Sequence, residues 1–150
     1  MRRIATIGFG NKPAERFIAL LRDARVVTII DTRRRPDVAS SGYARQRDLP
    51  FLLRSAANIG YEHRPELTPP VALLDRYGRD EDWPSYMHDF DRLVLDSPDA
   101  KQVMMNLLAR SATEMMALMC LEPTPHQCHR RLVAERMYEL DSSLEVIHLA

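Results

Sequence analysis

Two cysteines, a glutamate and a histidine lie close together in the segment "MCLEPTPHQCHR" of the 150-residue chain. Cys120 ends an apolar run, and Cys128 and His129 open a stretch whose apolar residues recur at helical spacing. A cysteine reacts as its thiolate, and a neighbouring histidine or carboxylate can move the proton. We therefore take Cys120, Cys128, Glu122 and His129 as candidate catalytic residues.

Each cysteine also has a structural interpretation. Free cysteine is among the most buried residue types, so either thiol could simply pack the core. Cys120 as the end of a core strand is as well supported as Cys120 as a nucleophile. Two cysteines form no disulfide scaffold in a chain of this size, and under reducing conditions we expect both to be free thiols.

A zinc site would draw on the same residues, with His126 as a fourth ligand. The spacing C-x5-H-x-C-H matches no common zinc motif. Consecutive residues on a helix also point about 100° apart, which would separate Cys128 from His129. We therefore expect no metal and no cofactor.

A helix is expected to begin just before Cys128. Thr124, Pro125 and Gln127 have the spacing of N-cap, N1 and N3 in a T-x-x-Q capping box. The free amides of a first helical turn favour an anion or a thiolate. Arg130 would follow half a turn after Cys128, where its guanidinium could hold an anion.

Two further polar segments follow short apolar runs. In "DTRRRP", Asp31 and Arg33 share one face if the strand persists, so they can pair with each other or with a ligand, and both outcomes remain open. "GFGN" is too short for a dinucleotide fingerprint. Asn11 is typical of a helix N-cap, and its place after a strand also makes it a candidate for substrate binding.

The elements that would position these groups alternate between strand and helix. The apolar runs at 4–7, 26–30 and 115–119 have the short, continuous form of buried parallel strands, and helical spacing follows each run. We expect one α/β domain over residues 1–150, a three-layer, Rossmann-like sandwich with a mainly parallel sheet. Gly8, Asp31 and Cys120 would then meet at its carboxyl edge, where such sheets bind ligands.

The remaining segments complete this layout. Residues 64–82, with three prolines and an acidic run, are expected to be irregular with at most a short helix, and residues 83–94 to form one helix. Ser97 and Pro98 are typical of the N-cap and N1 positions of the next helix. Short strands are expected at 61–64 and 144–149.

Composition excludes some classes of protein. Hydrophobic residues make up 45% of the chain, no apolar run is long enough to span a bilayer, and the N-terminus lacks the features of a secretory signal, so we expect a cytoplasmic protein with no membrane partner. The formal net charge is zero, which argues against a general nucleic-acid coat. Basic residues nevertheless outnumber acidic ones by 13 to 8 in residues 1–75, and 19 of the 21 basic residues are arginine, which suits local anion binding.

The order of these motifs resembles the family called domain of unknown function 488 (DUF488). The segments that carry the resemblance are "TIGFGN…FIALL", "DTRRRP", "WPSYM", "MCLEPTPHQCHR" and "VIHL", over residues 4 to 149. By that resemblance the family-type positions are Gly8, Asn11, Asp31, Arg33, Pro36, Tyr86, Cys120, Glu122, Cys128, His129, Arg130 and His148. Phe9 and Gly10 depart from it, since the family usually has histidine and serine or threonine there. The resemblance implies a compact α/β fold and no established activity.

Together these observations favour an enzyme that acts on an anionic substrate, such as a nucleotide or a modified base in nucleic acid. Arg33 and Arg130 would hold the anion, with Asn11, Asp31 and Tyr86 as further substrate-binding residues. The alternative is a non-catalytic module that binds phosphate or nucleic acid and uses its thiols structurally. Rapid, anion-protected alkylation of one thiol would favour the enzyme.

Overall fold

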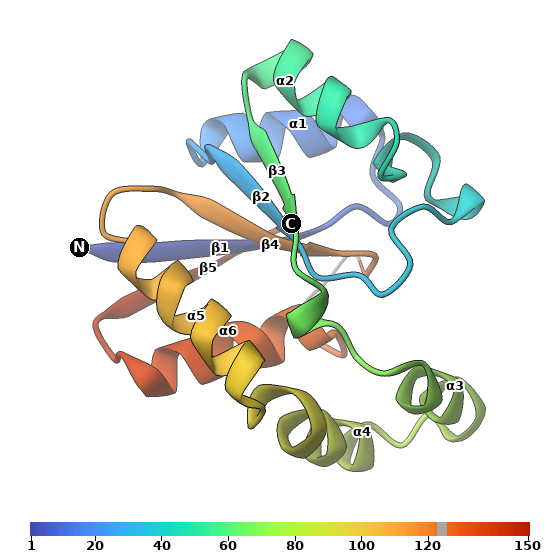
Figure 1. Ribbon diagram of the computed structural model, residues 1–150. Coiled ribbons are helices and arrows are strands. Elements are labelled where there is room, and N and C mark those ends of the chain that lie inside the picture. Colours follow the sequence, from blue (N-terminus) through green and yellow to red (C-terminus); the bar gives the residue numbers. More distant parts are fainter. Residues whose placement is uncertain (123–125) are drawn as a thin grey trace.

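The protein is built around one parallel β-sheet (Figure 1). The computed structural model describes residues 1–122 and 126–150, without the side chains of residues 39–41. The five strands have the spatial order β3-β2-β4-β1-β5. They are β1 (Arg2–Gly8), β2 (Thr28–Asp31), β3 (Gly60–His63), β4 (Met116–Cys120) and β5 (Leu144–Leu149).

The predicted central strands are confirmed as parallel neighbours. β4 pairs with β1 on one side and with β2 on the other, so the run 115–119 forms the middle of the sheet. The register places Gly8 opposite Cys120 and Asp31 opposite Met119. The polar groups that follow these strands therefore meet at one edge, as expected for parallel strands.

Helices cover both faces of the sheet and give the predicted three-layer α/β fold (Figure 1). The helices of the described residues are α1 (Ala14–Asp23), α2 (Leu49–Ala57), α3 (Val71–Asp80), α4 (Trp83–Phe90), α5 (Pro98–Arg110) and α6 (His129–Leu140). Helices α1 and α2 lie on one face, and α5 and α6 lie on the other. None of the helices in the described part of the chain is long and apolar enough to cross a membrane.

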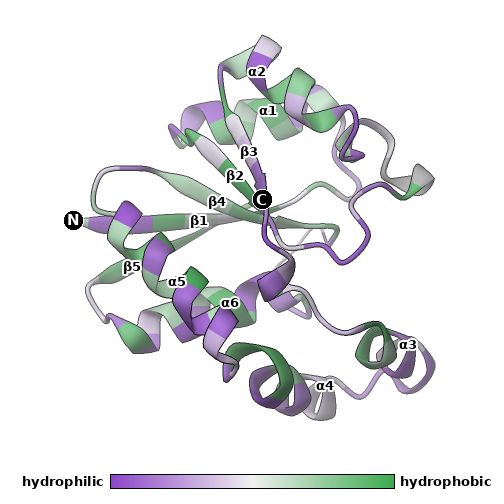
Figure 2. Cartoon of the chain, in the orientation of Figure 1, coloured by the Kyte–Doolittle hydropathy of each residue, from purple (hydrophilic) through white to green (hydrophobic). Residues whose placement is uncertain are grey.

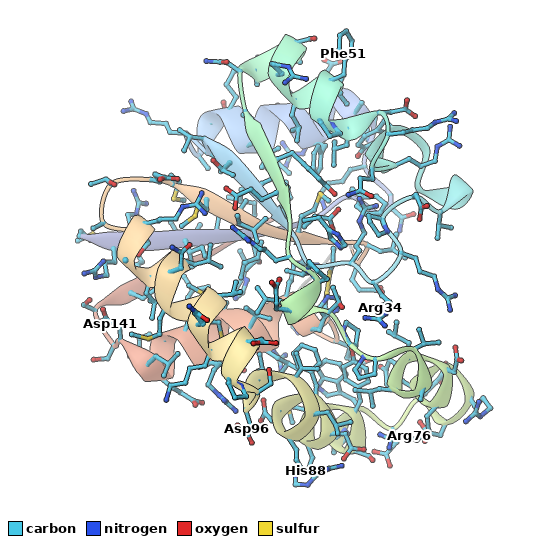
Figure 3. The ribbon with its side chains drawn as sticks, in the orientation of Figure 1. Arg34, Phe51, Arg76, His88, Asp96 and Asp141 are labelled. Carbon is cyan, nitrogen blue, oxygen red and sulfur yellow. A yellow bond between two sulfur atoms is a disulfide. The ribbon has the colours of Figure 1, made fainter. Side chains whose placement is uncertain are left out.

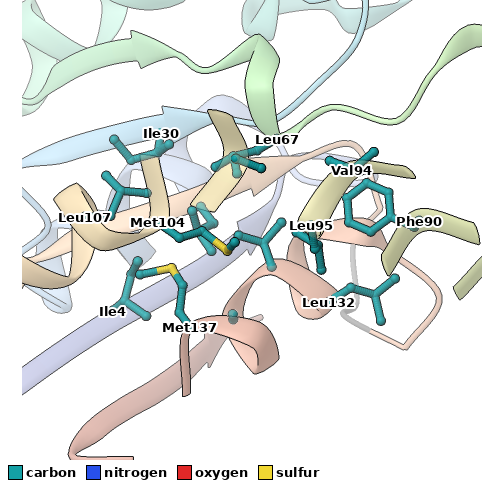
Figure 4. Close-up of a cluster of buried hydrophobic side chains, with 14 of the residues drawn as sticks. Ile4, Ile30, Leu67, Phe90, Val94, Leu95, Met104, Leu107, Leu132 and Met137 are labelled. Carbon is teal, nitrogen blue, oxygen red and sulfur yellow. The ribbon is translucent and has the colours of Figure 1, made fainter. Parts of the chain in front are cut away.

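The alternation of side chains along each strand divides the core into two clusters. Ile4 and Leu118 belong to the cluster under α5 and α6 (Figure 4), whereas Ala5 and Met119 belong to the cluster under α1 and α2. Figure 2 shows apolar colouring along β4, which is buried on both sides. By the same alternation, Cys120 faces the α6 side of the sheet.

Two predicted helical segments differ from the structure in detail. Residues 64–82 contain a short 3₁₀ turn (Pro65–Leu67) and the ten-residue helix α3, which is longer than expected because the prolines precede α3 rather than interrupt it. Residues 83–94 are helical as predicted, but α4 continues into a π-helical segment (Asp91–Leu95). The predicted cap of α5 is confirmed, since the Ser97 side chain accepts a hydrogen bond from the Ala100 N–H at 3.2 Å.

Helix α6 begins later than the capping box predicts. Its first helical residue is His129, and Cys128 is the N-cap in an extended conformation. Thr124 and Pro125 lie outside the described residues, so the capping interaction itself is not described. Asn11 is not an N-cap either, because α1 begins at Ala14 and Pro13 precedes it. Asn11 instead has a positive φ of 57° in the turn after β1.

Candidate functional site

A buried arginine joins the end of β4 to the start of α6. Arg130 is fully buried, and its Nη1 donates hydrogen bonds to Cys120 Sγ at 3.0 Å and to the Glu122 carbonyl oxygen at 2.7 Å. Gly8 makes this arrangement possible, because a Cβ at that position would collide with the Glu122 carbonyl. The glycine in "GFGN" therefore has a packing role at the site.

The positive charge of Arg130 is poorly compensated. Among the described residues, Nε and Nη2 of Arg130 have no hydrogen-bond partner, and no carboxylate forms an ion pair with it. Burial lowers the pKa of Arg130 to about 10, while the charge of Glu122 acts in the opposite direction. The guanidinium is still protonated at neutral pH, so a negative charge beside it would be stabilised.

The field of Arg130 reaches neighbouring bases. Burial and the Arg130 charge both lower the pKa of Lys12, on the loop after β1. Burial and Arg130 likewise lower the pKa of His148, whose Nδ1 lies 2.6 Å from the Thr6 hydroxyl oxygen on β1. This part of the carboxyl edge is therefore electropositive.

The two cysteines are linked by a disulfide bond. The expectation of two free thiols is wrong for this structure, because Cys128 returns to the end of β4 as the N-cap of α6. Both residues are buried, at 2% and 3% exposure, and both line the cavity described below. A thiolate is available only after this bond is reduced.

His129 is held in one tautomer. Its Nε2 lies 2.7 Å from the Thr32 carbonyl oxygen, which can only accept, so the proton of the neutral ring is on Nε2 and Nδ1 has the free lone pair. Burial lowers the pKa of His129 to about 4; the bond to Thr32 opposes this shift and the charge of Arg130 adds to it. His129 is therefore neutral at pH 7 and able to accept a proton.

Cys128 and His129 would point about 100° apart only if Cys128 were helical. Cys128 is extended, so the separation by 100° does not apply. One ligand atom each of Cys120, Cys128 and His129 lies within 4.8 Å of the others. These atoms could hold a thiophilic cation such as zinc only in the reduced protein, because the ligand must be thiolate.

Asp31 and Arg33 form an internal ion pair. Arg33 donates from Nε to Asp31 Oδ1 at 3.0 Å and from Nη2 to Oδ2 at 2.8 Å, and Nη2 also donates to the Ala44 carbonyl oxygen at 2.7 Å. Tyr61 donates its hydroxyl proton to Asp31 Oδ2 at 2.5 Å. Asp31 is fully buried and Arg33 is 7% exposed, so both side chains are committed to the interior.

A cavity of about 270 Å³ opens at the carboxyl edge of the sheet, with walls from the loops after β1, β2 and β4 and from α3, α4 and the start of α6. Its volume is close to the lower end of the range of about 300–1,000 Å³ for ligand pockets. Three aromatic side chains, Tyr77, Trp83 and Tyr86, form one wall. The Trp83 and Tyr86 rings are stacked, with centroids 5.2 Å apart.

Two exposed arginines lie on another wall of this cavity. Arg34 and Arg35 follow β2, and neither forms an ion pair among the described residues. Arg34 donates from Nη1 to the Thr68 hydroxyl at 3.3 Å, and Figure 3 shows it between the sheet and α3. The cavity thus combines aromatic rings, two arginines without described ion pairs and the Cys120–Cys128 disulfide.

Comparison with protein families gives one match. The model of DUF488, described as "Domain of unknown function DUF488", matches residues 13–137. The chain belongs to the DUF488 family. Comparisons with curated proteins and with solved structures find no match.

The cavity collects part of the residue set that the DUF488 resemblance indicated. Its walls include Arg33, Tyr86, Glu122 and the sulfur pair with His129, but neither Asn11 nor Arg130. Asn11 is exposed on the turn after β1. Arg33 and Arg130 do not face this cavity together, because Arg33 lines it while paired with Asp31, whereas Arg130 contacts Cys120 Sγ and is not among the cavity residues.

Phe9, Arg34, Arg35 and Tyr77 are among the cavity residues that the sequence analysis did not propose for the site. Phe9, one of the departures from the family pattern, packs under Arg33, whose guanidinium carbon lies 4.9 Å from its ring centroid. Tyr77 falls in the segment expected to be irregular. The signal for Arg34 and Arg35 was present in "DTRRRP", but only the structure distinguishes the arginine that Asp31 binds from those that remain exposed.

Proposed function

We propose that this cavity binds an anionic aromatic molecule, a nucleotide or a modified nucleobase, and that Cys120 reacts with it when reduced. The observation that carries the proposal is that one cavity is lined by the stacked aromatic rings, by Arg34 and Arg35, and by Cys120. A planar heteroaromatic ring fits such a wall, because aromatic pairs favour offset stacking.

The arginines supply the anion preference. A guanidinium offers a planar fork that matches phosphate and carboxylate oxygens, and a charge-assisted hydrogen bond is worth about 1.5–3 kcal/mol. Arg34 and Arg35 are suited to this role because they can bind without breaking an existing ion pair. A base on the aromatic wall with its phosphate on these arginines is the simplest occupant of the cavity.

The reactive group would be the Cys120 thiolate, which the Arg130 guanidinium at 3.0 Å stabilises. His129 is the better candidate for proton transfer, because its neutral ring has a free Nδ1. Glu122 is exposed at the cavity wall and is a second candidate. The reaction class proposed is addition of the thiolate to an electrophilic ring carbon of the ligand, in which the C=N π bond breaks and its electron pair moves to the ring nitrogen, which takes up a proton.

One observation favours a non-catalytic binding module. The disulfide occupies both sulfurs, so the oxidised protein has no thiol nucleophile. The same aromatic wall and arginines would still bind the ligand. Binding and thiol reactivity therefore need separate tests.

Binding can be followed through Trp83, the single tryptophan of the chain. Adenosine monophosphate, adenosine and inorganic phosphate should be titrated while Trp83 fluorescence is recorded. The nucleotide is expected to quench this fluorescence. Replacing both Arg34 and Arg35 by glutamine should raise the Kd of the nucleotide by about 10- to 100-fold, as expected for loss of a charge-assisted contact. Arg3→Gln, at the opposite end of β1, is the matched control and should leave Kd unchanged.

Thiol chemistry is tested by alkylating the reduced protein with iodoacetamide, alone and with saturating adenosine monophosphate. The enzyme proposal expects Cys120 to react first and the nucleotide to protect it. Two slowly reacting thiols together with nucleotide binding would support the binding module. Absence of nucleotide binding in both redox states would refute both.

A further inference from the structure

We propose that Cys120 and Cys128 form a redox-active pair in which hydroperoxides oxidise Cys120 and Cys128 then closes the disulfide. The structure already contains the product of this reaction, the Cys120–Cys128 disulfide on the cavity wall. The inference rests on the surroundings of the two sulfurs and goes beyond the ligand proposed above.

The two sulfurs differ in their surroundings. Within the described part of the chain, Cys120 Sγ accepts a hydrogen bond from Arg130, and no hydrogen bond to Cys128 Sγ is found. A neighbouring arginine favours the thiolate, which is the form that attacks peroxide. Cys120 is therefore the cysteine that is oxidised first.

Arg130 gives a second reason for this assignment. It is fully buried, and it lacks a described carboxylate partner. A buried charge without a counter-charge is costly, and the Cys120 thiolate would supply one at 3.0 Å. Reduction of the disulfide thus leaves a thiolate–guanidinium pair, whereas oxidation removes the negative member.

Cys128 has the position of the resolving cysteine. It is the extended N-cap of α6, where the helix dipole favours a developing thiolate. One ring nitrogen of His129 lies within 4.8 Å of both sulfurs, and the neutral ring can receive the proton that Cys128 loses. The disulfide shows that the two sulfurs can meet without another protein.

The chemistry balances with a hydroperoxide as the only oxidant. The Cys120 thiolate attacks the terminal oxygen of ROOH, the O–O bond breaks, and RO⁻ takes a proton to leave as ROH. Cys120 is then a sulfenic acid. The Cys128 sulfur attacks the Cys120 sulfur, the S–O bond breaks and water leaves with the Cys128 proton. An external dithiol returns both residues to the reduced state.

The test compares reduced wild-type protein with Cys128→Ser and Cys120→Ser, each treated with hydrogen peroxide in the presence of dimedone. Wild type should lose two hydrogen atoms by intact mass as the internal disulfide forms. Cys128→Ser should accumulate a dimedone adduct on Cys120. Cys120→Ser should be oxidised at least about 10-fold more slowly, since it lacks the arginine-stabilised thiolate.

Arg130→Lys tests the source of the reactivity while keeping a positive charge, and Arg130→Met removes the charge. Oxidation should slow in Arg130→Met and remain closer to wild type in Arg130→Lys, with melting curves to verify folding. Dimedone on Cys128, equal rates for the two single-cysteine variants, or a stoichiometric zinc ion that protects both thiols would overturn the proposal. Adenosine monophosphate titration of Cys120→Ser, read from Trp83, tests the proposed ligand separately.

Discussion

Replacement of Arg33 by methionine would leave Asp31 as a buried carboxylate without its cation. The change removes the Arg33 hydrogen bonds from Nε and Nη2 to Asp31 and the one from Nη2 to the Ala44 carbonyl. The Tyr61 hydroxyl and the Arg33 backbone N–H remain as donors to the carboxylate. Breaking a buried pair in this way costs about 3–5 kcal/mol. For a chain of this length, that corresponds to a fall in Tm of roughly 6–20 °C.

The assay is urea and thermal unfolding at pH 7, followed by circular dichroism. In the double variant Asp31→Asn/Arg33→Met, the stranded charge is gone and Tyr61 keeps an acceptor, so at least half of the lost stability should return. Arg47→Met is the surface control, because its pair with Asp48 is exposed and worth less than about 1 kcal/mol. A loss below about 1 kcal/mol in Arg33→Met, or no recovery in the double variant, would refute a structural role for the pair.

Four further substitutions can be tested by urea unfolding. Burial lowers the pKa of His129 from 6.5 to about 4, so the stability contributed by the neutral ring is present above pH 6.5 and is lost as the pH falls toward 4. Between pH 7 and 5, the free energy of unfolding should therefore fall by about 1–2 kcal/mol less in His129→Gln than in wild type. Gly8→Ala should cost about 1–3 kcal/mol because its Cβ meets the Glu122 carbonyl, whereas Gly78→Ala, with open space around it on α3, should stabilise by about 0.5–1 kcal/mol. Ser97→Ala should cost about 0.5–2 kcal/mol through loss of the α5 cap.

The sheet could be predicted from the sequence because buried parallel strands leave a direct signal. Residues 4–7, 26–30 and 115–119 are apolar on both faces, and helices cover both faces of these strands. Short length distinguished them from helices, and in residues 26–30 β-branched residues did so as well. Because these strands are parallel, their carboxyl ends lie at the same edge of the sheet, and Gly8 and Cys120 therefore meet there.

The start of α6 could not be predicted from local capping preferences. A capping interaction is worth only about 1 kcal/mol, so tertiary contacts can shift a helix boundary by several residues. Here the chain after β4 is held by the Glu122 carbonyl against Gly8 and Arg130, and the disulfide brings Cys128 back to the strand end. None of these contacts is local in sequence.

The aromatic wall was missed for a related reason. Prolines 69 and 70 favour irregular structure by their type alone, but Pro70 is the N-cap of α3, and Leu73, Leu74 and Tyr77 follow at helical spacing. Proline is compatible with the first turn of a helix, where its missing N–H costs nothing. Tyr77 therefore reaches Trp83 and Tyr86 from a helix that is longer than the segment was expected to contain.

The contrast between Arg33 and Arg130 explains why the two must have different roles. Both are buried arginines that follow strands of one sheet, but Asp31 neutralises Arg33, whereas Arg130 has no described carboxylate partner. Arg33 lines the cavity and Arg130 does not, so the two do not lie on one anion site there. The charge of Arg130 can instead be balanced by the group that it already contacts, Cys120 Sγ, once that sulfur is a thiolate. Arg34 and Arg35, which form no ion pair among the described residues, are the arginines that we propose for an external anion.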